Sequence, residues 1–104
     1  ITTFLKAANI GMGASVHQFS VIGHFSMVAM GSAVTKNIRP FTTYVTGKKP
    51  KVNVYALKKY DLMDYLDEIS AYVLEGKQPT SDKILTYTEE FEKLHTDSHR
   101  KLFE

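Results

Sequence analysis

The sequence predicts a mixed β/α fold, in which a short left-handed parallel β-helix of about two coils precedes a C-terminal α-helical cap. The first observation is a strict six-residue spacing of branched aliphatic residues between positions 9 and 38. The second is that four of the five positions four residues further on are small, and the third is an amphipathic pattern over residues 61–104. The aliphatic residues are Ile10, Val16, Ile22, Val28 and Val34, followed by Ala14, Ser20, Ser26, Ser32 and Ile38.

A six-residue period fits neither an amphipathic α-helix nor an alternating β-strand. In a β-helix three short strands form one triangular coil, so every sixth side chain enters the same interior row. Small residues let the backbone bend between the faces, and Gly11 and Gly23 directly follow two of the aliphatic residues. Ordinary hairpin strands with accidental spacing are the alternative. They are disfavoured because the segment contains no Asn-Gly or Asp-Gly turn.

The repeat is too short to be stable by itself. Solenoids usually need about three repeats before neighbouring units bury enough core, and at about 18 residues a coil this segment makes fewer than two coils. The rest of the chain, or other copies of it, must cover its ends and faces. We therefore expect an oligomer.

The repeat ends at Arg39-Pro40, because proline removes a ladder donor and restricts the residue before it. Residues 41–45 are predicted to be extended, residues 47–50 to form a loop, and residues 54–60 to make about two helical turns. This pattern predicts a truncated β-helix over residues 1–47 and a helical domain over residues 48–104.

Two further helices are expected in the C-terminal part. Asp61 or Asp64 can cap the first, which should end near Gly76. Thr80 or Ser81 can cap the second, with its acidic group facing away from the core. The polar stretch 95–99 is expected to break this helix before Arg100. The acidic group is Glu89, Glu90 and Glu92. The apolar pair at 102–103 is expected to dock on the helices.

Charge is divided sharply along the chain. Residues 1–60 contain eight basic and no acidic residues, whereas residues 61–104 contain eleven acidic and five basic residues. The two parts could simply attract each other. The other interpretation is an anionic ligand or acidic partner for a lysine cluster, which comprises Lys48, Lys49, Lys51, Lys58 and Lys59. Nucleic acid is not expected, since the cluster lacks interleaved aromatic residues.

Several other classes of protein are disfavoured by composition. The chain has no cysteine, which fits a reducing compartment, so we expect a cytoplasmic protein. It has no apolar run long enough to span a membrane and no signal-peptide core. We expect no metal or cofactor, because His17 and His24 have no carboxylate within ten residues and no phosphate-loop fingerprint is present. The first residue is Ile, and we expect the sequence to begin within a gene, or after processing or removal of a tag.

Four segments in order resemble the C-terminal half of one family, the bacterial acyl-carrier-protein-dependent UDP-N-acetylglucosamine O-acyltransferases that begin lipid A synthesis. They are Val16-His17-Gln18-Phe19, Ile22-Gly23, the exit from Val34 to Phe41, and Val52-Asn53-Val54 with Leu57-Lys58. The resemblance covers residues 9–60, and the later helices match a helical cap only in placement and length. It implies a homotrimer with sites between subunits, and acyl carrier protein and a UDP-amino sugar as partners.

The resemblance also implies roles for individual residues. His17 and Gln18 correspond to residues that contact the UDP-sugar, and Asn53 to one near the nucleotide; Lys59 keeps one basic residue of a pair while the family's acidic residue is lost. Met30 falls where the family measures its acyl chain, and a bulky residue there implies a short chain. His17 could instead be a wall histidine satisfied by a neighbouring coil.

The family's general base lies about two coils before the His-Gln-Phe element, outside these 104 residues. We therefore expect no catalytic residue here and no acyl transfer by this chain alone. His24 has no counterpart in the motif and is not assigned to catalysis. The alternatives are a non-catalytic trimeric scaffold or binding module that uses its basic face, and a domain excised from a full-length enzyme.

Overall fold

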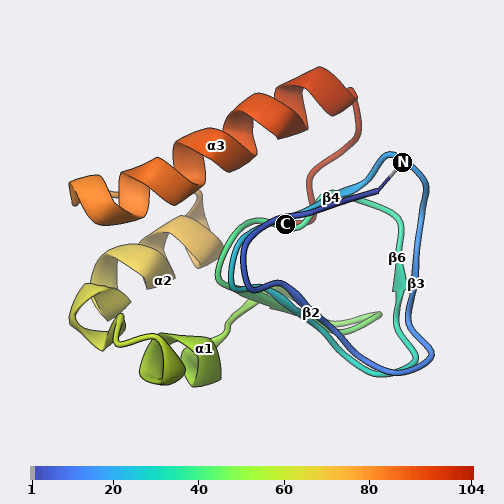
Figure 1. Cartoon of the computed structure of the whole chain (residues 1–104), viewed down its shortest axis with the longest axis horizontal. Helices are drawn as coiled ribbons and strands as arrows, with labels where there is room; N and C mark the ends of the chain where they lie inside the picture. Colours follow the sequence, from blue (N-terminus) through green and yellow to red (C-terminus); the bar gives the residue numbers. More distant parts are fainter. Residues whose placement is uncertain (1) are drawn as a thin grey trace.

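Short parallel strands, stacked in three small sheets, form the first part of the molecule, and the backbone winds around a roughly triangular outline (Figure 1). The computed structural model describes residues 2–104. In each of three strand pairs a residue lies beside the one 18 positions later, such as Thr3 beside Val21. The pairs are β1 (Thr3–Phe4) with β4 (Val21–Ile22), β2 (Asn9–Ile10) with β5 (Met27–Val28), and β3 (Ser15–Val16) with β6 (Ala33–Val34).

Tight turns connect these strands. In each turn a backbone N–H bonds to the carbonyl three residues earlier, as from Ser20 to His17 (3.2 Å) and from Ser26 to Gly23 (3.3 Å). The residue before each of these donors has a positive φ, and such residues recur every six positions: Ala7, Gly13, Phe19, Phe25 and Gly31. The left-handed conformation is what the third residue of a type II turn requires.

The predicted interior row forms one hydrophobic cluster. Ile22, Val28 and Val34 are fully buried, whereas Ile10 and Val16, on the first strands, are half-buried. Gly11 and Gly23 are needed for close contact between successive layers. A Cβ on Gly23 would lie 2.3 Å from the backbone nitrogen of Pro40, which no real Cβ can do.

Strand β7 (Thr42–Tyr44) continues the stack in parallel with β5, but after a circuit two residues shorter, with Met27 beside Thr43. The extended stretch predicted at 41–45 is thus confirmed. Strand β8 (Lys51–Val52) then pairs with β7 in antiparallel orientation. This hairpin around the predicted loop was not expected.

The last layer of strands is closed on all three sides. Strand β8 covers β7, and Leu102 in the C-terminal tail forms a parallel bridge to Asn37, which lies beside the Ile22–Ile38 bridge. On β6 the N–H of Ala33 donates to Thr46 Oγ1 (2.9 Å), and its carbonyl accepts from the Tyr44 hydroxyl (2.7 Å). Within residues 2–104, β1, β2 and β3 each pair on one side only.

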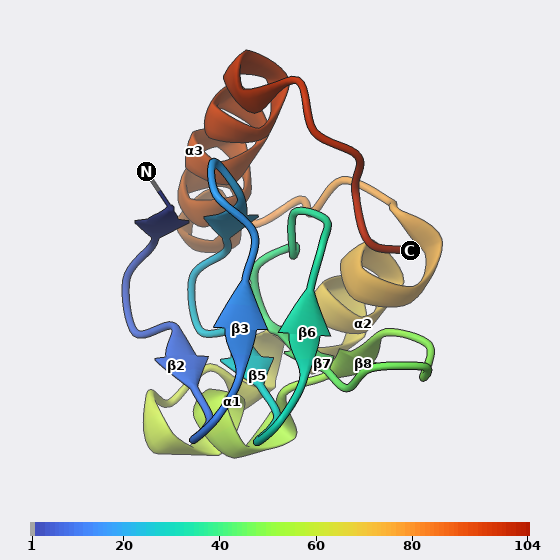
Figure 2. The same cartoon turned by 90° about the vertical axis from the view of Figure 1, so that its right-hand side faces the viewer.

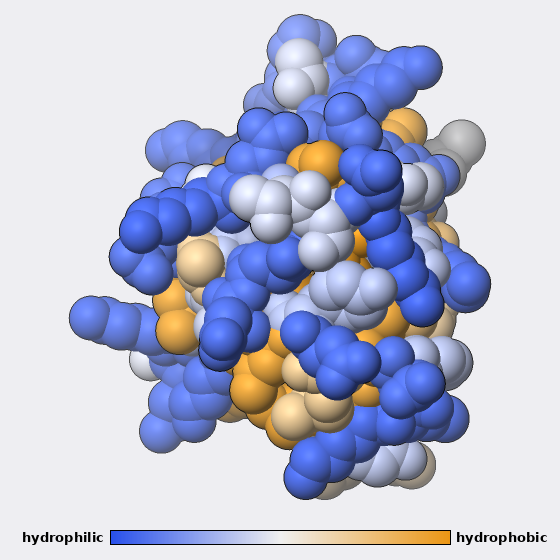
Figure 3. Space-filling model, turned by 90° about the vertical axis from the view of Figure 1, so that its left-hand side faces the viewer, coloured by the Kyte–Doolittle hydropathy of each residue, from blue (hydrophilic) through white to orange (hydrophobic). Residues whose placement is uncertain are grey.

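The helices follow in the order α1 (Val54–Lys59), η1 (Met63–Tyr65), α2 (Leu66–Glu75) and α3 (Asp82–Ser98). They lie together beside the coiled part (Figures 1 and 2), and the face of the molecule on their side is mostly hydrophilic, with small apolar patches (Figure 3). The two predicted helical turns at 54–60 are confirmed, as is the end of α2 at Gly76, which has a φ of 74°. None of the helices in residues 2–104 combines the length and the apolar character needed to cross a membrane.

The predicted caps of α2 were wrong, and the predicted cap of α3 was right in position only. Neither Asp61 nor Asp64 caps α2, because a 3₁₀ turn precedes it and Tyr65 takes the cap position without a side-chain bond. Ser81 occupies the cap position of α3, but its hydroxyl donates to Glu68 Oε2 (2.8 Å) rather than accepting from the helix. Glu68 also accepts from the Ser81 N–H (3.1 Å), so this contact ties α2 to the start of α3.

Helix α3 ends at Ser98, and His99 caps it in the left-handed conformation, so the break expected over residues 95–99 is confirmed at the end of that stretch. The acidic group does not simply face away. Glu90 contacts His24 and Glu92 contacts Tyr72, although both glutamates are exposed. A second hydrophobic cluster, which includes Phe25 and Phe41 together with Leu57, Ile69 and Ile84, joins the coiled part to the helices.

Candidate functional site

A pocket of about 220 Å³ lies between α1 and the coiled part. Ala7, Asn9 and Met27 contribute one wall, and the start and end of α1 contribute the other, through Asn53, Tyr55, Ala56, Lys59 and Tyr60. Two of the predicted ligand-binding residues, Asn53 and Lys59, therefore line the same pocket. The pocket combines an amide, a cation and two tyrosines, groups that can bind the anionic and hydroxylated parts of a small molecule.

Asn53 is held by the fold. Its Oδ1 accepts from the N–H of Ala56 (3.3 Å), which caps α1, and its Nδ2 donates to the carbonyl of Phe25 (2.9 Å). The side chain is 6% exposed. One amide hydrogen and one oxygen lone pair remain for a ligand, so Asn53 has a structural role whether or not it binds one.

Lys59 occupies the last turn of α1 and is exposed, with Nζ 5.6 Å from the ring centroid of Tyr60. The Tyr60 ring in turn packs against Phe25, with 5.1 Å between centroids. This contact keeps the ammonium group of Lys59 beside the pocket. A cation at the C-terminal end of a helix is also favoured by the helix dipole.

His17 and Gln18 lie away from this pocket. They follow β3, at the end of the coiled part near the C-terminus of α3, whereas α1 lies at the other end (Figure 2). Both are exposed. The Arg100 guanidinium, which the sequence did not single out, donates to the Gln18 carbonyl (3.0 Å) and lies 3.5 Å from His17 Nδ1.

Arg100 also donates to the carbonyl of Thr35 (3.0 Å), so it fastens two successive layers to the end of α3. The sequence did not indicate this role, because Arg100 is far in sequence from the residues that it contacts. Met30, the predicted acyl-chain residue, lies on the turn between β5 and β6 and is 74% exposed. Met12, 81% exposed, lies one layer earlier, where its carbonyl accepts from the N–H of Gly31 (2.9 Å).

His24 is buried, 1% exposed, with Nε2 2.5 Å from Glu90 Oε1. Burial lowers the pKa of the imidazole, and Lys6 adds to this, while the hydrogen bond and the charge of Glu90 oppose it. The other ring nitrogen, Nδ1, is buried without a hydrogen-bond partner in residues 2–104. An imidazole so enclosed joins α3 to the coiled part and is poorly placed to reach a substrate.

Among residues 2–104, no three His, Asp or Glu side chains converge as a metal site would require. The stacked parallel strands and the helices beside them resemble a β-helix fold with a helical part. The chain is similar in structure to the UDP-N-acetylglucosamine acyltransferase of Francisella novicida, with a TM-score of 0.68 and 19% identity over 98% of this chain and 43% of that one.

A second solved structure, the UDP-N-acetylglucosamine O-acyltransferase of Moraxella catarrhalis RH4, has a TM-score of 0.45 and 18% identity over 99% of this chain and 51% of that one. The chain thus spans about half the length of these enzymes or less. No family model and no curated protein matches the sequence. At these identities the likeness is one of fold.

Proposed function

We propose that the chain is a ligand-binding element related to the UDP-N-acetylglucosamine O-acyltransferases, built from the last left-handed coils of such an enzyme and its helical cap. The observation that supports this most strongly is the extent of the similarity. It takes in 98% of the chain, and hence the helices as well as the strands. The ligands we propose are a UDP-amino sugar and an acyl group delivered by acyl carrier protein.

Acyl transfer by these 104 residues alone is not part of the proposal. The reaction needs a general base near the sugar hydroxyl that attacks the thioester. Two histidines are already engaged by other side chains. His24 is buried against Glu90, and His95 Nδ1 lies 2.7 Å from Asn37 Nδ2. His17 and His99 are exposed, and no carboxylate of residues 2–104 forms an ion pair with either of them.

Three copies would form the functional assembly. The coiled part exposes large apolar side chains whose burial between copies would be favourable: Phe4, Met12, Phe19 and Met30. His17 and Gln18 lie at one end of the molecule and the pocket with Asn53 and Lys59 at the other. In the proposed trimer a complete sugar site would combine these residues from adjacent subunits, while Met30 would limit the acyl chain to a short one.

The first experiment measures the mass in solution by light scattering and then the binding of UDP-N-acetylglucosamine by calorimetry. We expect a trimer, binding without turnover of acyl carrier protein thioesters, and an affinity about ten-fold lower in Lys59→Gln. Lys36→Gln, which removes an exposed lysine elsewhere, is the matched control. A monomer would contradict the assembly, and equal affinity of Lys59→Gln and Lys36→Gln would contradict the site. Turnover lost in His17→Ala would overturn the assignment of a purely binding role.

A non-catalytic binding module is the second candidate, and the exposed lysine cluster favours it. Lys48 and Lys49 lie between β7 and β8, Lys51 begins β8, and Lys58 and Lys59 end α1. All five are exposed, and none forms an ion pair within residues 2–104. An acidic carrier protein that binds with a steep salt dependence, in the absence of any UDP-sugar binding, would support this function instead.

A further inference from the structure

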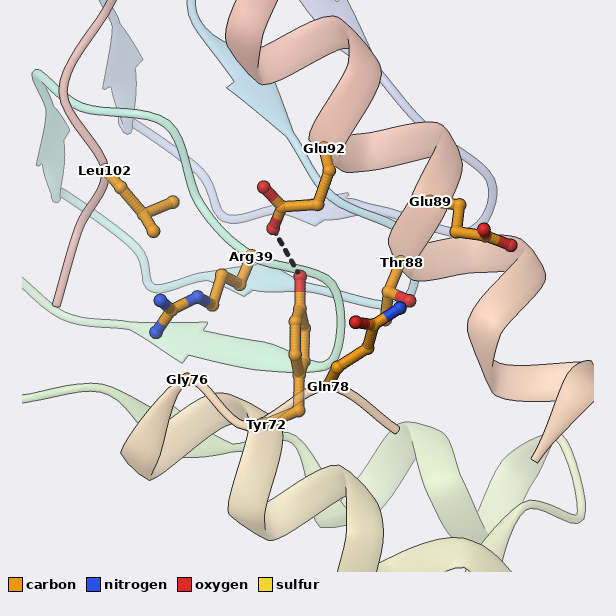
Figure 4. Close-up of a pocket in the computed structure, with 8 residues that line it drawn as sticks. All are labelled: Arg39, Tyr72, Gly76, Gln78, Thr88, Glu89, Glu92 and Leu102. Atoms are coloured by element: carbon orange, nitrogen blue, oxygen red, sulfur yellow. Dashed lines mark hydrogen bonds between the residues drawn. The ribbon is translucent and has the colours of Figure 1, made fainter. Parts of the chain in front are cut away.

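A second cavity, of about 580 Å³, is separate from the pocket beside α1. It lies where the exit of the coiled part meets α2 and α3 (Figure 4). Its volume is within the range of small-molecule sites. The lining residues are Arg39, Tyr72, Gly76, Gln78, Thr88, Glu89, Glu92 and Leu102.

Arg39 provides a cation that has no carboxylate partner within residues 2–104. Its guanidinium lies over the ring of Tyr72, with Cζ 5.6 Å from the centroid. Nε is buried, and within residues 2–104 it has no hydrogen-bond partner. The guanidinium also forms no ion pair there. A buried donor without an acceptor is uncommon in proteins. Nε is out of reach of a ligand, so the terminal nitrogens Nη1 and Nη2 are the atoms of this guanidinium that can bind an anion.

Gly76 helps to hold this guanidinium in place. A Cβ at Gly76 would lie 3.2 Å from Arg39 Nη2, so the absence of a side chain makes room for it beside the end of α2. The negative end of the α2 dipole is a purely structural explanation for a cation here. That explanation does not account for the cavity, or for the carboxylates on its far side.

The far side of the cavity carries the opposite charge. Glu92 Oε1 accepts from the Tyr72 hydroxyl (3.4 Å), and Glu89 lies about one turn earlier in α3 (Figure 4). Burial first, and Glu92 second, raise the pKa of Tyr72, so its hydroxyl remains a proton donor. Each carboxylate retains free lone pairs, and Gln78 adds an amide on this side.

We propose that this cavity binds a small zwitterion, with a carboxylate on Arg39 and an ammonium group on Glu92. A guanidinium and a carboxylate can form two parallel hydrogen bonds, which fixes the orientation of the ligand. A simple anion would be repelled by Glu89 and Glu92, and a simple cation by Arg39. Arg39 lies over the face of the Tyr72 ring and Glu92 at its hydroxyl end, so the two charges of the ligand must be separated (Figure 4).

The probes are the free ω-amino acids glycine, 4-aminobutyrate and 6-aminohexanoate, titrated into the intact chain and followed by NMR shifts of α2 and α3 amides. Affinity should rise with the separation of the two charges. Hexanoate and hexylamine carry one charge each and should bind about ten-fold more weakly than 6-aminohexanoate. Equal binding of hexanoate and 6-aminohexanoate, or no shift with about 10 mM of any probe, would overturn the proposal.

The matched variants are Arg39→Gln and Glu92→Gln against the controls Lys36→Gln and Asp67→Asn, which remove like charges at exposed positions outside the cavity. Each cavity variant should bind 6-aminohexanoate about ten-fold more weakly, and the controls should bind as the parent does. Loss of binding in Arg39→Gln with no effect of Glu92→Gln would rule out the zwitterion. If Arg39→Gln unfolds, Glu92→Gln and the hexylamine comparison still decide the matter.

Discussion

Asn37 Nδ2 lies 2.7 Å from His95 Nδ1, although 58 positions separate the two residues in sequence. The same amide donates to Ser98 Oγ (2.8 Å), and Oδ1 accepts from the N–H of Val21 (2.8 Å). Asn37 is fully buried. One side chain thus joins two layers of strands to the last turns of α3.

Replacing Asn37 with Ala should therefore be costly. The change leaves the buried N–H of Val21 without an acceptor and removes both contacts to α3, for an expected loss of about 2–3 kcal/mol in the free energy of unfolding. Urea denaturation measures this directly. Asn9→Ala, at an exposed strand position, should change stability by less than about 0.5 kcal/mol. Equal effects of the two substitutions would show that the Asn37 contacts do not stabilise the fold.

Stability should also depend on pH through His24. Burial lowers the folded-state pKa of this imidazole below the usual 6.5, so the unfolded chain takes up a proton more readily than the folded one. The contribution is complete above about pH 6.5 and is lost as the pH falls through the folded-state pKa. In urea titrations from pH 8 to pH 5, His24→Gln should flatten this dependence. His99→Asn, which removes an exposed imidazole at a left-handed position, should leave it unchanged.

Substitutions at two glycine positions distinguish the effect of steric crowding on stability from that of backbone strain. Gly23→Ala would place a Cβ 2.3 Å from the backbone of Pro40, and should cost more than about 2 kcal/mol or prevent folding. Gly31 has a φ of 74° and open space around it, so Gly31→Ala should cost only about 1–2 kcal/mol for the left-handed backbone. Thermal unfolding compares the two. A milder effect at Gly23 than at Gly31 would contradict the close approach of the layers.

The C-terminal tail should protect the edge that it covers. The Asn37 N–H donates to the Lys101 carbonyl (2.8 Å), and the Phe103 ring packs edge-on against Tyr44, with 4.7 Å between centroids. Phe103→Ala should lower stability by about 1–2 kcal/mol and speed hydrogen exchange at the Asn37 amide. The exposed tyrosine variant Tyr55→Ala should leave that amide protected. Unchanged exchange in Phe103→Ala would mean that the tail is not needed there.

The sequence was most informative where the local backbone conformation decides which type of residue can occupy a position. The six-residue spacing predicted the parallel strands, and the φ preference of glycine predicted the end of α2 at Gly76. The first strand was missed even though Phe4 lies six residues before Ile10. Phe4 was left out because it is not branched at Cβ, and it is not buried. A criterion of side-chain size alone would have included it in the six-residue repeat.

Contacts between distant residues could not be predicted. Nothing near His24 in the sequence indicates Glu90, and nothing near His17 indicates Arg100, because the approach of α3 is set by the whole helical core. The same reason explains why the sequence did not indicate the contacts of Glu90 with His24 and of Glu92 with Tyr72, although all three glutamates of the acidic group are exposed. Of the predicted binding residues, the structure brings Asn53 and Lys59 to one pocket, and the roles of all five stay predictions.

The closure of the last strand layer gives the stack a direction. Strand β8, the tail at Leu102 and the Tyr44 and Thr46 side chains occupy the hydrogen-bonding groups on one end, while β1, β2 and β3 leave theirs open on the other. Copies of residues 2–104 that met end to end would set the open strands of one copy against the covered layer of the next, which disfavours a repeating filament. Main-chain pairing with another strand is instead favoured at the end formed by β1, β2 and β3.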